Sequence, residues 1–547
     1  MRKTAMPHAA MHPLPTIALW LAATLGWSAD SCDVVVYGGT SSGVMAAVQA
    51  ARMGKSVILI EPGRHLGGMT SGGLGFVDAG NPQTVGGLGR EYFHLVWSHY
   101  QEDASWTREK RHSLAEQHGP LPANDQTMWV VEPAVAEQLF DHLASEAKVT
   151  VVRGERLERK SGVHKTGQRI TGITMESGRA LTARMFIDAT YEGDLLAAAG
   201  VSYTLGREAN AQYGETIDGI RPLPKPGRFP LGIDPYVTAG NPASGLLPRI
   251  KPDHGGNPGD ADRGIQAYNY RMCLTSDAAN RVAIQRPDAY DEKDYELVFR
   301  FIAAGSSEKF FKPSPLPNLK TDTNNNGYLS TDYVGMNWDY PEADYATRER
   351  IAQAHERWQR GLLWTLQNHQ RVPAAMRAEY GRWGLAKDEF TDHGYWPHQL
   401  YIREARRMVS DCVISENTAL GKEPAADPVG LGSYSMDSHA IKLFVAPDGT
   451  VSSEGGMFVK IPAPFGISYR ALIPKRGECE NLVVPVCCSA THAAYGTLRM
   501  EPIFMVLGQS AATAACLALD RNVALQELPY AALRERLLAD GQRLGKE

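Results

Sequence analysis

Residues 34–63, VVVYGGTSSGVMAAVQAARMGKSVILIEPG, decide the fold. The stretch begins with a β-branched run, passes through a glycine-containing turn into an alanine-rich segment that stops at Gly54, and ends in a second apolar run. This pattern predicts a strand over 34–37, a helix over 42–53 and a strand over 57–60. Strand, turn, helix and strand in that order begin a doubly wound parallel sheet, so the sequence predicts an α/β fold.

The turn YGGTSSG is an imperfect dinucleotide-binding fingerprint. Gly38 and Gly43 fill the first and third glycine positions of G-x-G-x-x-G, but Thr40 stands where the middle glycine lets the backbone approach the pyrophosphate. Gly39 and Ser42 keep the loop small, and the start of the following helix offers free N–H groups to an anion. We therefore expect the turn to bind phosphate, with the Thr40 hydroxyl as a donor.

Glu61 ends the second predicted strand. A carboxylate at this spacing accepts hydrogen bonds from ribose hydroxyls and repels a 2′-phosphate. Any glycine-rich turn before a helix resembles the fingerprint, so Glu61 supplies the evidence that the turn alone lacks.

Three later segments bear on the ligand. Gly67 and Gly68, in PGRHLGGMTSGG, would let the backbone lie against a cofactor. Asp194, in FIDATYEGDLLAAAGV, follows a strand and is expected to bind hydroxyls. A helix that begins near Pro502, with small residues over 508–515, would either point its N-terminus at the cofactor or simply pack in the core.

Several motifs in order resemble one family. They are YGGTSSG, EPGRHLGGMTSGGLG, IDATYEGDL, NNNGYLSTDYVG, HQLYIREARRM, DSHA, YRALIPKRGECENL and RMEPIFMVLGQSA. The chain after Ser31 resembles the FAD-dependent oxidoreductases, on the fumarate reductase and amine oxidase branch of the glutathione-reductase-like superfamily. The resemblance implies FAD held by Gly38, Gly43, Glu61, Gly67, Gly68, Asp194 and the helix that carries Gly508 and Gln509. Thr40 and Met69 depart from the superfamily pattern.

The chain is long enough for more than one domain. Residues 31–215 are expected to form the first part of a Rossmann-like FAD-binding domain, and residues 216–400 an irregular connection and an inserted α+β substrate domain. Residues 401–547 are expected to return through the substrate domain and complete the FAD-binding domain. The middle region contains many tryptophans and tyrosines and shows helical periodicity over 345–367.

Residues 1–29 have the pattern of a signal peptide, because basic residues precede an apolar run over 15–29 that is too short to span a bilayer comfortably. This predicts a periplasmic or secreted protein without a stable membrane span. If translation instead starts at Met6 or Met11, the protein is cytoplasmic.

Composition narrows the range of partners. The net charge is -5 and no block of like charges is present, so the sequence gives no footprint for nucleic acid and favours a small-molecule substrate. The seven cysteines lack zinc-ligand spacing, and neither a metal site nor a disulfide framework is expected.

Three residues are the candidate catalytic groups. His492 lies just before the C-terminal helix, His439 lies in MDSHA, and Arg403 belongs to an arginine cluster suited to an anionic group. No second strand-turn-helix unit for NAD(P)H is recognisable, so an external electron acceptor is expected.

Three functions are compatible with these features. The first is a dehydrogenase or oxidase that removes a hydride from a CH–OH or CH–NH carbon and is reoxidised by oxygen, a quinone or a carrier. The second is an enoate (fumarate-type) reductase in which Arg403 clamps a carboxylate. The third is a protein with the FAD-binding fold but without turnover.

Overall fold

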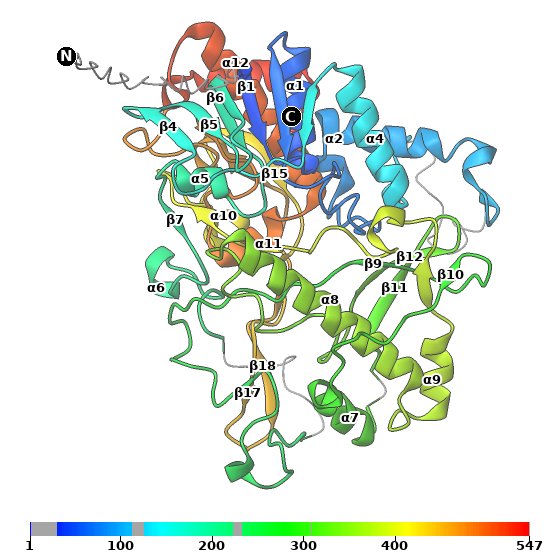
Figure 1. Ribbon diagram of the computed structural model, residues 1–547. Coiled ribbons are helices and arrows are strands. Elements are labelled where there is room, and N and C mark those ends of the chain that lie inside the picture. Colours follow the sequence, from blue (N-terminus) through cyan, green and yellow to red (C-terminus); the bar gives the residue numbers. More distant parts are fainter. Residues whose placement is uncertain (2–29, 112–124, 222–231, 307, 546–547) are drawn as a thin grey trace.

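The computed structural model describes residues 1, 30–111, 125–221, 232–306 and 308–545. Apart from Met1, the predicted signal peptide lies outside these residues. In Figure 1 a parallel sheet occupies the top of the molecule, α8 crosses the middle, and a second sheet lies with α7 and α9 in the lower half.

The first sheet has the strand order β3-β2-β1-β6-β5-β4, and β21 pairs with β6. Strands β3, β2, β1, β6 and β21 run parallel, whereas β5 and β4 form an antiparallel extension. Its strands are β1 (Asp30–Tyr37), β2 (Val57–Glu61), β3 (Thr150–Arg153), β4 (Val163–Thr166), β5 (Arg169–Thr174), β6 (Ala180–Asp188) and β21 (Leu482–Val483). The predicted α/β fold with a parallel sheet is confirmed, and β21 brings the C-terminal part of the chain into the sheet.

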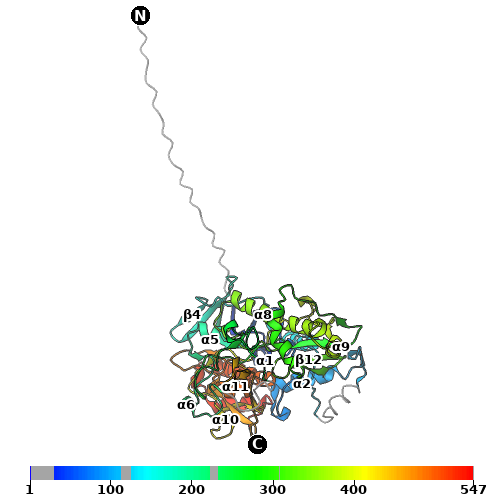
Figure 2. The same ribbon diagram turned by 90° about the horizontal axis from the view of Figure 1, so that it is seen from below.

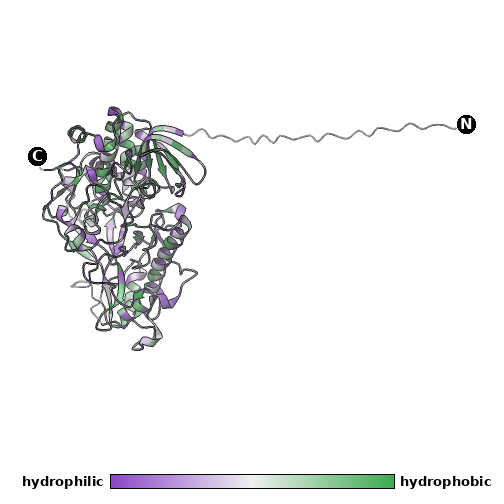
Figure 3. Cartoon of the chain, turned by 90° about the vertical axis from the view of Figure 1, so that its left-hand side faces the viewer, coloured by the Kyte–Doolittle hydropathy of each residue, from purple (hydrophilic) through white to green (hydrophobic). Residues whose placement is uncertain are grey.

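Strand β1 is buried on both faces because helices and loops cover the sheet on each side. Val34 and Val36 face one hydrophobic cluster, which contains α1 and α12, whereas Val35 and Tyr37 face another. Successive side chains of a strand point to opposite faces, so a continuous β-branched run suits a central parallel strand. In Figure 3 strands of this sheet carry the hydrophobic colouring.

Helices α1 and α12 pack against each other beside this sheet (Figure 1). The helices of this part of the molecule are α1 (Ser41–Arg52), α2 (Gly87–His99), α4 (Pro133–Glu146), α5 (Asp194–Ala198), α11 (His492–Leu498), α12 (Glu501–Arg521) and α13 (Tyr530–Ala539). Among the described residues, α12 is the one helix long and apolar enough to cross a membrane, and it is buried in the core.

The second sheet is antiparallel, with the order β10-β13-β9-β12-β11. Its strands are β9 (Met272–Thr275), β10 (Arg281–Val282), β11 (Phe311–Leu316), β12 (Lys320–Asn325) and β13 (Gly384–Ala386). Three helices accompany it: α7 (Glu296–Ala303), α8 (Tyr345–Asn368) and α9 (Ala374–Gly381). The sequence therefore correctly predicts an α+β region inserted between the two parts of the parallel sheet, with a helix where its periodicity indicates one.

Short strands and helices join the two halves. They are β7 (Tyr203–Thr204) with β14 (Arg407–Met408), β15 (Pro428–Gly432) with β20 (Phe465–Ser468), β16 (Met436–Ser438) with β19 (Met457–Val459), the sheet of β8 (Ile250–Lys251), β17 (Lys442–Val445) and β18 (Val451–Glu454), and the helices α6 (Asn210–Tyr213) and α10 (Glu416–Ala419). In Figure 2 the start of α8 lies near α5, where Arg348 of α8 forms an ion pair with Asp194.

Candidate functional site

The turn between β1 and α1 is closed by Thr40, the N-cap of α1. Its hydroxyl accepts a hydrogen bond from the Gly43 N–H at 3.2 Å and donates to the carbonyl oxygen of Ala189 at 2.7 Å. The hydroxyl thus has its own partners, which corrects the expectation that it donates to a phosphate. The N–H groups of Ser41 and Ser42 open the helix and have no partner within it, so the backbone supplies the anion-binding donors.

Two glycines of the fingerprint and one glycine of α12 allow backbone segments to approach closely. Gly38 has a φ of +103°, and a Cβ atom on it would lie 2.7 Å from the backbone nitrogen of Thr190. A Cβ on Gly43 would overlap the Gly38 carbonyl oxygen, and one on Gly508 of α12 would overlap the carbonyl oxygen of Ser42. Gly43 and Gly508 therefore act in packing, and Ser42 lies against α12.

Glu61 holds the glycine turn through hydrogen bonds to backbone N–H groups. One carboxylate oxygen accepts from the Gly39 N–H at 2.7 Å and the other from the Gly63 N–H at 2.5 Å. Burial raises the pKa of Glu61 to about 7, against the lowering effect of these N–H groups. The carboxylate is placed at the carboxyl end of β2, as the spacing predicts for a ribose-binding residue.

A cavity of about 310 Å³ lies over this turn. Gly38, Thr40 and Glu61 line one side of it, and Thr190 and Tyr191 continue the lining at the end of β6. Its volume is at the lower limit of small-molecule sites. The cavity, the glycine turn and the N-terminus of α1 together fit the phosphate and ribose part of a dinucleotide.

The glycine pair after β2 lies beside the turn. Gly67 and Gly68 have φ values of +99° and +55°, which favour glycine, and the Gly67 N–H donates to the Gly39 carbonyl oxygen at 2.8 Å. The next N–H, of Met69, donates to the Tyr191 hydroxyl at 2.8 Å. This loop therefore continues the site away from the phosphate turn.

Asp194 is not free to bind cofactor hydroxyls, which corrects that expectation. Arg348 contacts both of its oxygens, at 2.6 and 2.9 Å, and Arg406 and Arg159 contact one of them at 2.9 and 3.2 Å. Burial opposes ionisation, but these guanidinium groups hold the pKa of Asp194 below its usual value. Asp194 instead anchors α8 to the end of the parallel sheet.

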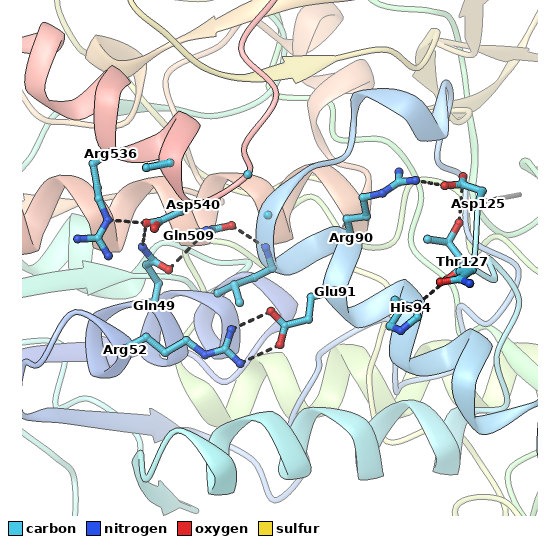
Figure 4. A pocket seen from close by; sticks show the side chains of 15 residues that line it. Gln49, Arg52, Arg90, Glu91, His94, Asp125, Thr127, Gln509, Arg536 and Asp540 are labelled. Atoms are coloured by element: carbon cyan, nitrogen blue, oxygen red, sulfur yellow. Dashed lines mark hydrogen bonds and ion pairs between the residues drawn. The ribbon is translucent and has the colours of Figure 1, made fainter.

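Gln509 also lies elsewhere than expected. Its side-chain oxygen accepts from the Leu88 N–H at 2.8 Å and from the Gln542 amide at 2.9 Å. It lines a separate cavity of about 720 Å³ beside Gln49 and Asp540 (Figure 4). The cofactor expectation for the Gln509 side chain is therefore corrected.

His439 and Arg403, two of the predicted catalytic residues, meet at Asp332. His439 Nδ1 lies 2.7 Å from one carboxylate oxygen, and Arg403 Nη2 lies 3.1 Å from the other. Burial and the charge of Arg403 lower the pKa of His439, although Asp332 opposes them. The imidazole is thus neutral near pH 7, with its Nδ1–H on Asp332 and its Nε2 available as an acceptor.

His492 occupies a different environment. Its Nδ1 lies 2.7 Å from a carboxylate oxygen of Glu404, and its side chain is only 2% exposed, against 13% for His439. Burial alone would lower the pKa of His492, but Glu404 raises it above the ordinary value. His492 is therefore the more strongly protonated and less accessible of the two histidines.

Gln266 connects the two histidine pairs. Its amide nitrogen donates to Glu404 at 3.0 Å, and its oxygen accepts from the His439 backbone N–H at 3.3 Å. The structure thus brings His492, His439 and Arg403 into one buried network. Arg403 is 1% exposed and is part of the interior of this network.

Arg499, which follows α11, and Glu501, the first residue of α12, join the network to the phosphate turn. Arg499 donates to Asp437 at 2.8 Å and to the Tyr401 hydroxyl at 2.9 Å, while Glu501 accepts from the Ser41 hydroxyl at 2.5 Å. Asp437 also lies 3.9 Å from His439 Nε2. Two residues of one segment therefore reach both parts of the site.

Sequence reasoning missed the residues that hold this arrangement together: Tyr191, Gln266, Asp332, Glu404 and Glu501. Four of them occur in or beside motifs that are recognisable in the sequence, but their partners lie far away along the chain. A carboxylate in the first turn of a helix, such as Glu501, is also a common dipole-stabilising residue and gives no separate signal.

Comparison with known proteins adds a family match. The model of the family described as FAD dependent oxidoreductase matches residues 33–537. No curated protein matches the chain.

Similar solved structures include OxyS anhydrotetracycline hydroxylase from Streptomyces rimosus, at 15% identity and a TM-score of 0.22, over 33% of this chain and 36% of that chain. L-proline dehydrogenase from P. horikoshii matches at 16% identity and a TM-score of 0.22, over 33% and 59% of the two chains. L-amino acid deaminase from Proteus vulgaris matches at 15% identity and a TM-score of 0.22, over 34% and 54%. The match spans less than two thirds of each of these proteins.

Proposed function

The chain belongs to the FAD-dependent oxidoreductase family and is an FAD enzyme, and we propose that it oxidises a CH–OH or CH–NH carbon of a small polar substrate, with His439 as the proton acceptor. The observation that carries this proposal is the pairing of a neutral, partly exposed histidine with a buried aspartate. When bound, FAD supplies the acceptor for the hydride.

The protein's own residues would handle the proton. Asp332 accepts the Nδ1–H of His439 and so fixes the tautomer that leaves Nε2 with a lone pair. Oxidation of an alcohol or amine carbon releases a hydride and one proton from the O–H or N–H group, and Nε2 takes that proton. Arg403 favours the neutral imidazole, which is the state that a base requires.

His492 would have a supporting role. Its burial and its bond to Glu404 suit a group that stays charged and holds the Glu404 carboxylate in place. The opposite pKa shifts of His439 and His492 support assigning the base role to His439.

The geometry of Arg403 speaks against the enoate reductase alternative. Its guanidinium group contacts Asp332 and the side-chain oxygen of Asn269 and is buried, so a substrate carboxylate would have to displace these partners. The family assignment disfavours the alternative without turnover.

Anaerobic mixing tests the proposed reaction. Purified holoenzyme is mixed with alcohols, sugars and amines, and the visible absorbance of FAD is followed. A true substrate should bleach the flavin. If none does so while a fumarate-like acceptor reoxidises the reduced enzyme, the reductase function replaces the proposed one.

We also propose that the protein is exported and that an external oxidant reoxidises it. The apolar run over 15–29 supports export. Fractionation of tagged protein, with N-terminal sequencing, would show a shortened chain outside the cytoplasm; a full-length cytoplasmic chain would contradict export.

A further inference from the structure

The dinucleotide cavity contains a histidine with no assigned role. His398 lines it together with Gly38 and Glu61. Both ring nitrogens of His398 are buried, and neither has a hydrogen-bond partner among the described residues. A neutral imidazole has one N–H donor and one acceptor, and leaving these groups unpaired in the interior costs free energy.

The ring is held in a fixed orientation. It stacks on His65, with ring centroids 3.9 Å apart and planes at 15°, and it meets Phe390 edge-on at 5.4 Å. His65 is itself held by Glu137 at 2.9 Å and Asp392 at 3.3 Å. Burial, with a smaller contribution from His65 and His393, lowers the pKa of His398 to about 3, so the ring is neutral.

The cavity is lined by acidic side chains, so a neutral hydrogen-bond donor would help it to bind a phosphate-containing cofactor. Its described lining contains the carboxylates Glu61, Glu192, Glu349 and Glu356 and neither lysine nor arginine. FAD presents two phosphates and several hydroxyl oxygens, which need donors. The N-terminus of α1 provides some, and the His398 N–H is a further donor already desolvated and oriented.

We propose that His398 is a cofactor-binding residue whose ring N–H donates a hydrogen bond to an oxygen of FAD. The inference rests on FAD as the cofactor and is independent of the substrate proposed above.

The test is titration of FAD into apoprotein carrying His398→Phe. Phenylalanine keeps the stack on His65 and removes both nitrogens. The dissociation constant should rise by about 10-fold, as expected for one lost hydrogen bond. The apoprotein melting temperature should stay the same or rise, because an unpaired polar group has left the interior.

Amide variants show which nitrogen donates. Gln places its NH₂ near the Nε2 position and Asn near Nδ1, so one of His398→Gln and His398→Asn should restore much of the affinity. His164→Phe is the matched control: His164 lies on β4 outside this cavity, is exposed, and its Nε2 lies 2.8 Å from the Thr174 hydroxyl oxygen. It should bind FAD as the wild type does.

Two results would overturn the proposal. Wild-type affinity in His398→Phe would mean that no bond to FAD is lost. Weaker FAD binding together with a lower apoprotein melting temperature, without recovery in either amide variant, would assign His398 a structural role alone.

Discussion

The phosphate turn and the His439 network are built from different parts of the chain. The turn consists largely of backbone contributed by neighbouring residues, with Glu61 bound to the N–H groups of Gly39 and Gly63. The network consists of side chains from distant segments, since His439 meets Asp332 at a separation of 107 residues. We therefore expect substitutions in the turn to disrupt it by steric overlap. Substitutions in the network should act by removing a charge that balances a neighbouring charge.

The largest effect is expected from Gly43→Val. Its Cβ would overlap the Gly38 carbonyl oxygen inside the β1–α1 contact, where neither backbone can withdraw. We expect destabilisation of more than about 5 kcal/mol and loss of FAD. Flavin absorbance of the purified protein and thermal unfolding measure it, with Gly381→Val as the control because a Cβ there meets nothing within 4 Å. A yellow, stable Gly43→Val protein would refute the assignment of this turn.

Arg403→Gln should perturb the His439 network without loss of FAD from the phosphate turn. Burial and Arg403 both lower the pKa of His439, so removing the guanidinium group should raise it. The base is then protonated up to a higher pH, and the acid limb of the flavin-reduction rate should move to higher pH. Breaking the buried pair with Asp332 should cost about 3 kcal/mol of stability. An unmoved acid limb with a raised KM for carboxylates would instead identify Arg403 as a substrate clamp.

Glu61→Gln should have an intermediate effect on the turn. Glutamine can accept from Gly39 or Gly63 but not both, so FAD binding should weaken by about 1–3 kcal/mol. Burial raises the pKa of Glu61 from an ordinary value of 4.5 to about 7. The folded state therefore keeps this proton longer than the unfolded chain, and Glu61 lowers the free energy of unfolding as the pH rises through that window.

Denaturant unfolding of the apoproteins between pH 4 and 8 would measure this contribution. The Gln variant should lose less stability than the wild type as the pH rises. Equal pH dependence would show that Glu61 ionises normally.

Thr40→Gly should have the smallest effect. It removes the N-cap and the hydrogen bond to Ala189, which should cost about 1 kcal/mol, while the backbone donors of α1 remain. FAD content should be unchanged, and Thr40→Ser should match the wild type in melting temperature. Loss of FAD from Thr40→Gly alone would mean that the hydroxyl does contact the cofactor.

The difference between the phosphate turn and the His439 network also explains which features could be predicted from sequence. The strand, turn and helix around Gly38 and the position of Glu61 follow from local spacing, and the structure reproduces them. Asp194 also has a recognisable position, but its partners Arg348, in α8, and Arg406, just before β14, occupy its carboxylate oxygens. The role of Asp194 depends on ion pairs with distant arginines, and the periodicity and spacing of the sequence do not predict such pairs.

His439 and His492 illustrate this limit again. Their positions in the sequence mark both as candidate bases, but the charges around them decide which is neutral. Asp332 and Arg403 surround one, and Glu404 the other. These neighbours lie outside the motifs that carry the two histidines, so the sequence predicts the candidates and the structure distinguishes them.

Anaerobic flavin reduction in His439→Asn tests the central claim, that cofactor binding and proton transfer lie in separable halves, most directly. With a substrate that bleaches the wild-type enzyme, this variant should contain a full complement of FAD and be reduced about 10²- to 10⁴-fold more slowly. Reduction at the wild-type rate, or a colourless variant, would contradict the claim.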